Sequence, residues 1–241
     1  MNKRLPHAVL DLESRYLKAK KIENLLMLNS KNKLSLLEVG VGSGGIAYYF
    51  ANISEGQYEV TAVDLVDSRC IFDGYDFHLV DGTSLPFENE TFDVVISNHV
   101  IEHVGDCCAQ ISHLNELGRI LKKTGVGYLA VPNRWMLIEP HYKLVFLSWL
   151  PKICRSPYLR LLKSIAFYDC EPLQKNEIEG MFNRTQFLFK NLCVDALRLT
   201  FELEKPHSLT TRFLRRIPNF LLEPLVPIIP TLIYRIKKNE I

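Results

Sequence analysis

The sequence predicts an α/β fold, in which helices cover both faces of a parallel sheet. Three observations predict this fold class. Short apolar runs alternate with helix-compatible stretches between residues 34 and 133, most of these runs end in a polar residue, and the first run leads directly into a glycine-rich turn. In sheets of this kind, ligands bind beyond the carboxyl ends of the strands. The polar residues at those ends are therefore the first candidates for a functional site.

The predicted elements follow in order along the chain. An amphipathic pattern of apolar residues predicts a first helix over Ala8–Leu28. Strands are predicted at residues 34–39, 58–63, 77–80, 92–97, 126–131, 187–194 and 231–237, with the last at the edge of the sheet. Helices are predicted at 44–51, 107–121 and 173–182, and the stretch 197–229 is expected to be helical but broken by prolines.

Composition narrows the function classes. Of 241 residues, 47% are hydrophobic and 23% charged, which is typical of one folded domain. The formal net charge of +2 is too small to indicate a nucleic-acid partner. No secretory signal and no apolar run of about 18 residues is apparent, so we expect a cytoplasmic protein. The six cysteines form no C-x-x-C pair and no zinc-type spacing, and we expect reduced, mostly buried thiols and no metal.

The glycine-rich turn indicates a nucleotide-like ligand. Gly40, Gly42, Gly44 and Gly45 follow the first strand, and glycine permits both unusual backbone angles and close approach of a ligand. The same glycines also fit the G-x-G-x-x-G pattern of dinucleotide binding. Glu38 favours another ligand, because its carboxylate would repel a pyrophosphate and attract the ammonium group of S-adenosylmethionine.

Two further carboxylates follow the next strands. Asp64 ends the second strand, where it could accept hydrogen bonds from ribose hydroxyls. Asp81, followed by Gly82 and Thr83, could accept from an adenine amino group, and Leu65 could contact the ring. The alternative for Asp81 is a structural role in capping a turn.

Several ordered motifs resemble the class I S-adenosylmethionine-dependent methyltransferases. LLEVGVGSGG, VTAVDL, LVDGTSLPFENETFDVVISNHVIEHV and LGRILKKTGVGYLAVPN are similar to successive motifs of the type 11-like group, which is related to quinone and sugar methyltransferases. The resemblance extends from about Leu36 to Asn133. It implies a doubly wound, Rossmann-like, mostly parallel sheet of seven strands in the order 3-2-1-4-5-7-6, with the last strand reversed and helical insertions near the C-terminus.

The resemblance also implies roles for individual residues. Glu38 and Gly40 would face the methionine part of the cofactor, Asp64 its ribose, Asp81 its adenine, and Asn98 and His99 its open side. The expected cofactor-binding residues are Glu38, Gly40, Val41, Gly42, Gly44, Asp64, Leu65, Asp81, Gly82, Thr83, Asn98 and His99. We expect one domain over residues 1–241, with an N-terminal helix (1–33), a cofactor-binding core (34–133) and helical insertions on the acceptor side (134–186 and 197–229).

Methyl transfer is an in-line displacement, so the protein must align the acceptor and, for a hydroxyl, help to remove its proton. His99 and His103 are spaced to share one face of a helix, if that stretch is helical. Glu102 and His103 also match a pair that assists deprotonation in some relatives. The candidate catalytic residues are His103, His99 and His141; the alternative for His103 is a role in packing or capping.

The residues after the fifth strand are candidates for acceptor binding, namely Glu139, His141 and Tyr142. NRWMLIEPHYKL resembles a subgroup of bacterial methyltransferases, some of them encoded with envelope polysaccharide functions. Trp135 and Tyr142 could stack on a sugar or ring, or could be core aromatics of the insertion.

Two basic stretches bear on the acceptor. Tyr142–Tyr168 contains five lysines and arginines but no acid, and forms either a solvated helix face or a surface for a phosphate-bearing acceptor or an anionic membrane. Arg212, Arg215 and Arg216 lie among apolar residues and form either a cover over the acceptor pocket or a membrane contact. The acceptor classes we expect are a small molecule, a glycan or a lipid-linked molecule, with peripheral contact at the inner face of the membrane.

Two other functions fit parts of the pattern. A nicotinamide-dependent oxidoreductase would use the same glycine turn, but Glu38 and the later motifs argue against it. A catalytically silent binding subunit would keep the fold without the chemistry, but the intact glycines and acids argue against that.

Overall fold

The computed structural model describes residues 11–28, 32–139, 141–165 and 167–239. Helix α1 (Leu12–Leu26) begins after Asp11, whose side chain accepts a hydrogen bond from the backbone N–H of Glu13. The first residues of the predicted Ala8–Leu28 helix lie outside the described part of the chain. Within the described part, no helix is both long enough and apolar enough to cross a membrane.

The sheet has seven strands and confirms the predicted order. Across the sheet they are β3 (Asp76–Leu79), β2 (Tyr58–Asp64), β1 (Leu34–Val39), β4 (Phe92–Asn98), β5 (Leu121–Pro132), β9 (Thr231–Lys238) and β8 (Phe187–Asn191). The first five are parallel, and β9 runs antiparallel to both of its neighbours. This is the order 3-2-1-4-5-7-6 when strands are counted along the chain.

Two strand predictions are wrong in detail. The last strand, β9, lies between β5 and β8 and not at the edge; half of its side chains are buried, among them the consecutive Leu232, Ile233 and Tyr234, as expected for an inner strand. The sixth strand ends at Asn191, short of the predicted residue 194, because Cys193 begins helix α6 (Cys193–Glu204) and its N–H is bonded by the Asn191 side chain.

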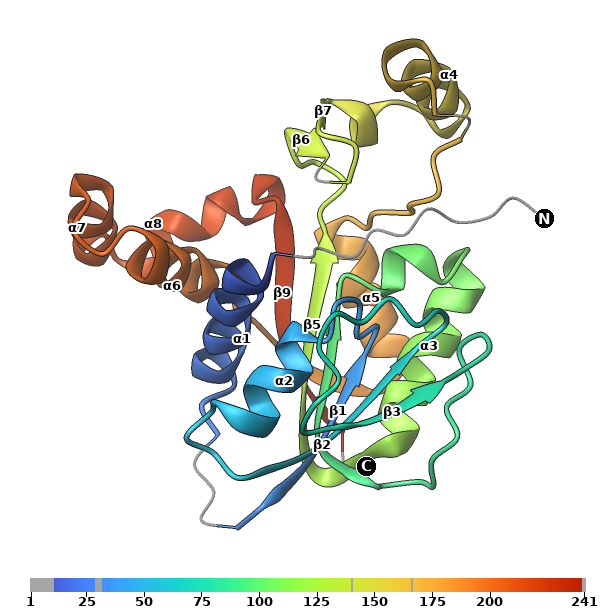
Figure 1. Ribbon diagram of the computed structural model, residues 1–241. Helices are drawn as coiled ribbons and strands as arrows, with labels where there is room; N and C mark the ends of the chain where they lie inside the picture. Colours follow the sequence, from blue (N-terminus) through green and yellow to red (C-terminus); the bar gives the residue numbers. More distant parts are fainter. Residues whose placement is uncertain (1–10, 29–31, 140, 166, 240–241) are drawn as a thin grey trace.

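Helices cover both faces of the sheet (Figure 1). On one face, α1, α2 (Gly45–Asn52) and α6 pack over a cluster of buried apolar side chains. On the other, α3 (Cys107–Ile120) and α5 (Lys175–Arg184) pack over a second cluster. The two layers leave the carboxyl ends of the parallel strands open for a site.

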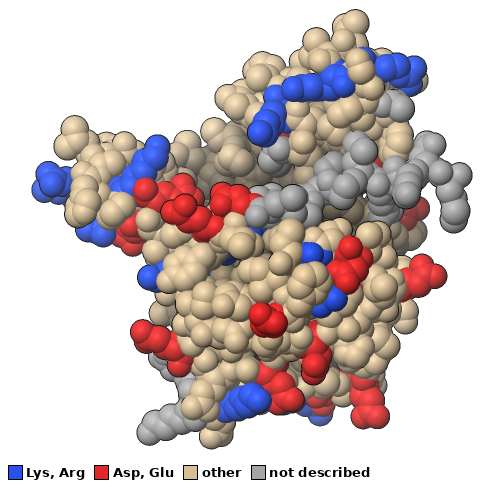
Figure 2. Space-filling view, in the orientation of Figure 1, with Lys and Arg blue, Asp and Glu red and all other residues tan. Residues whose placement is uncertain are grey.

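Two lobes project beyond these carboxyl ends (Figure 1). The α4 lobe, residues 137–163 apart from residue 140, contains β6 (Ile138–Glu139), β7 (Leu144–Val145), η2 (Leu147–Trp149) and α4 (Lys152–Lys163). The α7 lobe, residues 209–228, contains α7 (Leu209–Arg216), α8 (Asn219–Leu222) and η3 (Glu223–Ile228). Figure 2 shows both lobes standing out from the body, with Lys and Arg side chains on each.

One buried asparagine links the two insertions. Pro132, which ends β5, pairs with Thr231, which begins β9. Next to this pair, Asn133 donates from its side chain to the carbonyls of Pro227 at 2.7 Å and Ile229 at 2.8 Å. The chain that enters one insertion is therefore bonded to the chain that leaves the other.

The cysteines differ from the expectation of mostly buried thiols. Cys170 and Cys193 are buried, but the other four are exposed, namely Cys70, Cys107, Cys108 and Cys154. Three of these four lie on helix surfaces, and Cys70 lies in a loop. The usual burial of cysteine does not predict these exposed positions. All six are free thiols in the described structure.

Candidate active site

The glycine turn follows β1 at the carboxyl edge of the sheet. Gly40, Gly42 and Gly44 have φ angles of 79°, 52° and 84°, in the left-handed region that favours glycine. A Cβ atom on Gly40 would lie 2.4 Å from Cγ2 of Val100. The turn is therefore packed closely against the segment that follows β4, and Gly40 is required there for two separate reasons.

Three buried polar atoms beside this turn have no hydrogen-bond partner within the described structure. They are Oε2 of Glu38, Oγ of Ser43 and Oδ1 of Asn98. Glu38 is 2% exposed, and burial raises its pKa well above the usual value despite the nearby charge of Arg15. Unsatisfied buried polar atoms are rare in folded proteins, so their concentration here fits a polar ligand with an ammonium or other donor groups.

The two later carboxylates lie on the same edge, because β3, β2, β1 and β4 are neighbours in this order. Asp64 accepts from the N–H of Gly42 at 3.0 Å and from the N–H of Leu65 at 2.7 Å, so it orders the glycine turn. Asp81 is exposed two residues after β3 ends, and the following Gly82 has a φ of 74°. Asp64 therefore faces the turn, and Asp81 stands at the open rim.

The histidines after β4 meet around Glu102. His99 follows β4 with a φ of 60°, a conformation that non-glycine residues adopt mainly at functional or strained sites. The predicted shared helix face is wrong, since only a short 3₁₀ turn, η1 (Ile101–His103), forms here. The two rings converge through a carboxylate instead: Oε1 of Glu102 lies 3.3 Å from Nδ1 of His99 and 3.8 Å from Nε2 of His103.

Burial and the contacts between His99, Glu102 and His103 together set the protonation of His99 and Glu102. Burial lowers the pKa of His99, although the hydrogen bond and charge of Glu102 act in the opposite direction. Burial alone would raise the pKa of Glu102, but the hydrogen bond and charge of His99, with the charge of His103, outweigh it and lower the pKa. A neutral His99 next to an ionised Glu102 can accept a proton.

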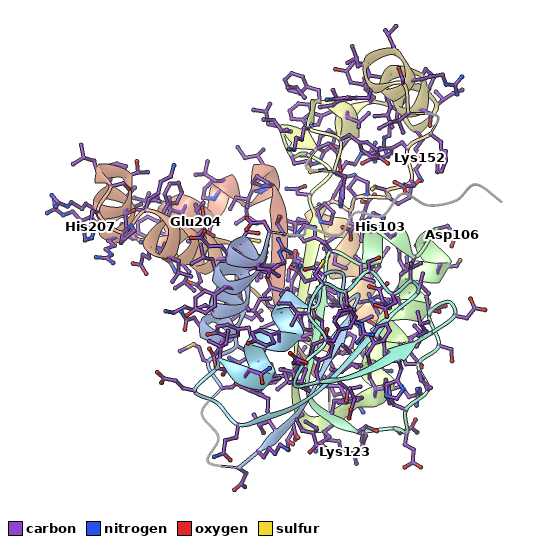
Figure 3. All side chains as sticks on the ribbon, viewed as in Figure 1. His103, Asp106, Lys123, Lys152, Glu204 and His207 are labelled. Carbon is purple, nitrogen blue, oxygen red and sulfur yellow. The ribbon has the colours of Figure 1, made fainter. Side chains whose placement is uncertain are left out.

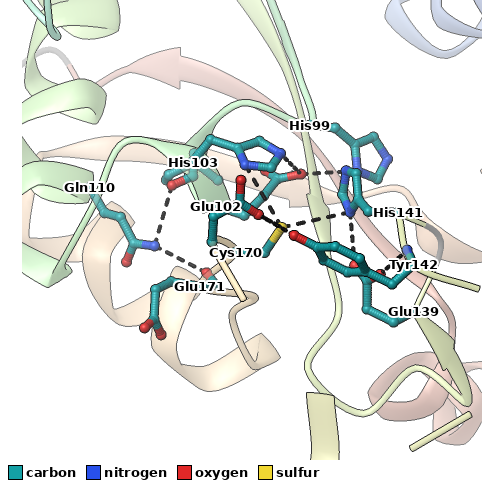
Figure 4. A network of polar contacts seen from close by, with 11 residues as sticks. His99, Glu102, His103, Gln110, Glu139, His141, Tyr142, Cys170 and Glu171 are labelled. Carbon is teal, nitrogen blue, oxygen red and sulfur yellow. Dashed lines mark hydrogen bonds and ion pairs between the residues drawn. The ribbon is translucent and has the colours of Figure 1, made fainter. Parts of the chain in front are cut away.

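The α4 lobe brings a second polar group to the same place (Figure 4). Nδ1 of His141 lies 2.8 Å from Glu139, whose other oxygen accepts from the N–H of Tyr142 at 2.7 Å. Burial alone would lower the pKa of His141, but the hydrogen bond and charge of Glu139 raise it. The ring centres of His103 and His141 are 5.1 Å apart, and the two rings pack edge to face. The candidate base and the candidate acceptor residues are thus neighbours.

Cys170 lies between these two histidines. Its Sγ is 3.8 Å from Nδ1 of each, and the thiol donates to Asp169 at 3.5 Å. The three residues could hold a metal ion, since their donor atoms lie within 4.8 Å of one another, but zinc bonds of about 2.0–2.3 Å would require the donors to move closer. Burial and the surrounding carboxylates raise the pKa of Cys170, so the thiol is neutral.

The aromatic residues of the insertion have structural contacts. Tyr142 is buried and donates its hydroxyl to Asp169 at 2.6 Å, and it packs against Tyr168. Trp135 donates to the side chain of Gln174 at 3.0 Å and packs edge to face on Trp149. Both rings therefore hold the insertion together, which is the alternative to stacking on a sugar.

The basic residues of α4 differ in their surroundings. Arg155 is buried and donates to the carbonyls of Leu150 and Ser148, so it is not part of a solvated face. Lys152, in the upper part of Figure 3, is exposed and pairs with Glu171 at 2.8 Å. His103 lies below the lobe in the same view, between Lys152 and the sheet.

Some residues at the site were not singled out from the sequence. Arg15, on α1, acts on Glu38 through its charge, and its Cβ packs against Gly45. Cys170 and Asp169 join the histidines from a segment without regular secondary structure. Ser43 could have been predicted from the sequence, because it lies inside the glycine motif. Arg15, Cys170 and Asp169 reach the site only because distant segments of the chain pack together, and no local sequence pattern indicates that packing.

The comparisons with known proteins agree with this geometry. Residues 37–129 match the model of a family described as a methyltransferase domain. The chain is 27% identical over 134 residues to the ubiquinone biosynthesis O-methyltransferase of Parvibaculum lavamentivorans, covering 49% of each protein. It is 33% identical over 134 residues to the enzyme of the same name from Paramagnetospirillum magneticum, covering 49% of this chain and 50% of that protein. The chain thus spans about half the length of these curated relatives.

A solved structure extends the likeness of the fold. Haemonchus contortus phosphoethanolamine N-methyltransferase 2, in complex with S-adenosyl-L-methionine, superposes with a TM-score of 0.52 and 16% identity, covering 94% of this chain and 53% of that one. At this identity the likeness concerns the fold alone. Together with the matched domain, it supports a Rossmann-like methyltransferase fold for this chain, with the sheet order expected for class I, S-adenosylmethionine-dependent methyltransferases.

Proposed function

We propose that this chain transfers a methyl group from S-adenosylmethionine to a nucleophilic atom, in the first instance a hydroxyl oxygen, of a small or lipid-linked acceptor. The observation that carries the proposal is the buried carboxylate of Glu38, which has an unpartnered oxygen beside the glycine turn. An ammonium group would satisfy that oxygen and relieve the burial of a charge. Asp64 would hold the ribose, and Asp81, with Gly82 and Thr83, the adenine.

The chain's own contribution to the reaction would be alignment and proton removal. Bound S-adenosylmethionine would supply an electrophilic methyl carbon, whose bond to sulfur breaks as the acceptor attacks. His103 or His99 would take the acceptor's proton, and Glu102 would stabilise the resulting imidazolium. His141, oriented by Glu139, would bind the acceptor from the opposite side. The rims formed by the two lobes would limit access of water.

The acceptor class follows from the surroundings of these histidines. The matched relatives are named as ubiquinone biosynthesis O-methyltransferases, which favours a hydroxyl on a ring. The exposed apolar side chains of the two lobes favour an acceptor with a lipid part, and their basic side chains favour one with a phosphate part. A glycan carried on a lipid phosphate has both parts. A role in envelope polysaccharide synthesis is one setting in which such an acceptor occurs.

Calorimetry on the purified chain tests the cofactor. We expect S-adenosylhomocysteine to bind with micromolar affinity and NADH not to bind, because Glu38 attracts an ammonium and repels a pyrophosphate. Glu59, an exposed acid on the neighbouring strand, gives the matched control: Glu38→Gln should weaken binding and Glu59→Gln should not. Binding of NADH in place of S-adenosylhomocysteine would overturn the proposal.

Methyl transfer to a panel of catechol and quinol acceptors tests the chemistry. His103→Gln should reduce turnover by about 100-fold or more while leaving S-adenosylhomocysteine affinity within about twofold, because it removes a base and not a cofactor contact. Activity that a chelator abolishes would instead favour a metal held by His103, His141 and Cys170. Cofactor binding without transfer to any acceptor would favour the silent binding subunit.

A further inference from the structure

The apolar residues exposed to solvent are concentrated in the two lobes. Of the twenty-three large hydrophobic side chains that are exposed in the described part of the chain, eight belong to the α4 lobe and six to the α7 lobe. Ile153 and Leu161 on α4 are 83% and 82% exposed, and Leu209 and Phe213 on α7 are 80% and 66% exposed. Exposed apolar groups gathered in this way mark a contact surface.

Basic residues outnumber acidic residues next to these apolar groups. The α4 lobe carries exposed lysines and arginines and contains no acid between Tyr142 and Tyr168. The α7 lobe carries Arg212, Arg215 and Arg216, with Glu223 as its acid. Figure 2 shows basic side chains along both lobes, with a group of acidic side chains beside the α7 lobe and others on the body. One of the basic residues, Arg215, pairs with Glu202 at 2.8 Å. Apolar groups beside cations match the boundary of an anionic bilayer.

The two lobes are also placed to act together. Both leave the sheet at its carboxyl edge, where Asn133 bonds one insertion to the other. A flat surface that rested on both lobes would lie over the carboxyl edge of the sheet, on the side where His103 lies (Figures 1 and 3). An acceptor anchored in that surface would lie on the same side of the sheet as the histidines that follow β4.

We infer that the α4 and α7 lobes form one docking surface for an anionic lipid bilayer, on which the protein lies without crossing it. The side chains that enter the boundary are Ile153, Leu161, Leu209, Phe213 and Phe220, and the lysines and arginines around them contact lipid phosphates. The position of the acceptor in the bilayer rests on the proposed methyl transfer. The binding to lipid does not, and it is measurable without cofactor or acceptor.

Vesicle co-sedimentation of the full chain tests the docking surface. We expect about tenfold more binding to vesicles with about 30% phosphatidylglycerol than to pure phosphatidylcholine, decreasing as salt is raised. Leu209→Ser with Phe213→Ser, Ile153→Ser with Leu161→Ser, and Arg212→Glu with Arg216→Glu should each reduce binding by about tenfold. All of these side chains are exposed, so the thermal unfolding temperature should stay within a few degrees of the unaltered chain.

Exposed apolar residues on the body provide the matched control. Ile53 at the end of α2 and Leu188 on the edge strand β8 are exposed but lie outside the lobes, so Ile53→Ser with Leu188→Ser should leave vesicle binding unchanged. Absence of binding to anionic vesicles would overturn the inference. So would binding that the control reduces as much as the lobe variants do, or a self-associated chain that Phe213→Ser converts to monomers, since a second copy would then be the occupant.

Discussion

The donor edge and the two lobes are built in different ways. At the donor edge, meaning the carboxyl ends of β1 to β4 with the glycine turn, the sheet holds the polar groups in place, and several are buried without a hydrogen-bond partner among the described residues. In the α4 lobe, by contrast, the buried Arg155 bonds two carbonyls of its own loop and, within the described residues, Oγ of Ser148 is the buried side-chain atom left without a partner, while apolar groups of both lobes face outward. From this difference we infer that the donor edge is suited to binding a small polar ligand, and that the lobes are suited to contact with a large apolar and anionic surface.

The largest effect is expected when a side chain is added within the glycine turn. Gly40→Ala places a Cβ atom 2.4 Å from Val100 and forces alanine to a φ of 79°, so we expect a cost of about 3 kcal/mol or more and loss of S-adenosylhomocysteine binding. Gly82 is the matched control, because it also has a positive φ but has open space around it. Gly82→Ala should cost about 1 kcal/mol. Equal losses of stability, measured by chemical denaturation, would show that close packing of the turn is unimportant.

Glu38 offers a sharper test, since stability and binding should change in opposite directions. Burial raises the pKa of Glu38, so its contribution to stability is fully present below the unfolded value of about 4.3 and is lost as pH rises through the folded pKa. Glu38→Gln should therefore be more stable than the unaltered chain at pH 7, by about 1–2 kcal/mol, and equally stable near pH 4. It should bind S-adenosylhomocysteine about 10–100-fold more weakly. A variant that loses stability as well as affinity would assign Glu38 a structural role.

The same contrast explains what the sequence predicts and what it does not. The strands, the glycine turn and Asp64 follow from local patterns, because a short apolar run, its polar last residue and a cluster of glycines each occupy only a few residues. The neighbourhood of His103, His141 and Cys170 depends on how a lobe folds back over the sheet, and neither spacing nor residue type carries that information. The proximity of His99 to His103 was predicted for the wrong reason: the helix face that would align them does not form, and both rings lie near the carboxylate of Glu102 instead.

Asn133 tests whether the lobes act as one surface. Asn133→Ala leaves the carbonyls of Pro227 and Ile229 without their side-chain donor, which should cost about 1–3 kcal/mol. We expect proteolysis of the α7 lobe to become faster and vesicle binding to weaken, while binding of S-adenosylhomocysteine stays within about twofold. Asn89, an exposed asparagine that accepts from Arg119, provides the control substitution to alanine. Unchanged proteolysis would mean that the two insertions do not depend on each other.

The smallest change in stability is expected for a substitution of Lys152. A comparison with Arg155 distinguishes two basic residues of α4, one exposed and one buried. The pair between Lys152 and Glu171 is exposed, so Lys152→Ala should change the free energy of unfolding by less than about 1 kcal/mol. Arg155→Ala should cost more, because its guanidinium is buried on two carbonyls. If Lys152 also contacts a phosphate of the acceptor, Lys152→Ala should raise the acceptor KM at constant kcat, with its unfolding unchanged. A large loss of stability in Lys152→Ala would contradict the distinction between an outward-facing cation and one that holds the lobe together.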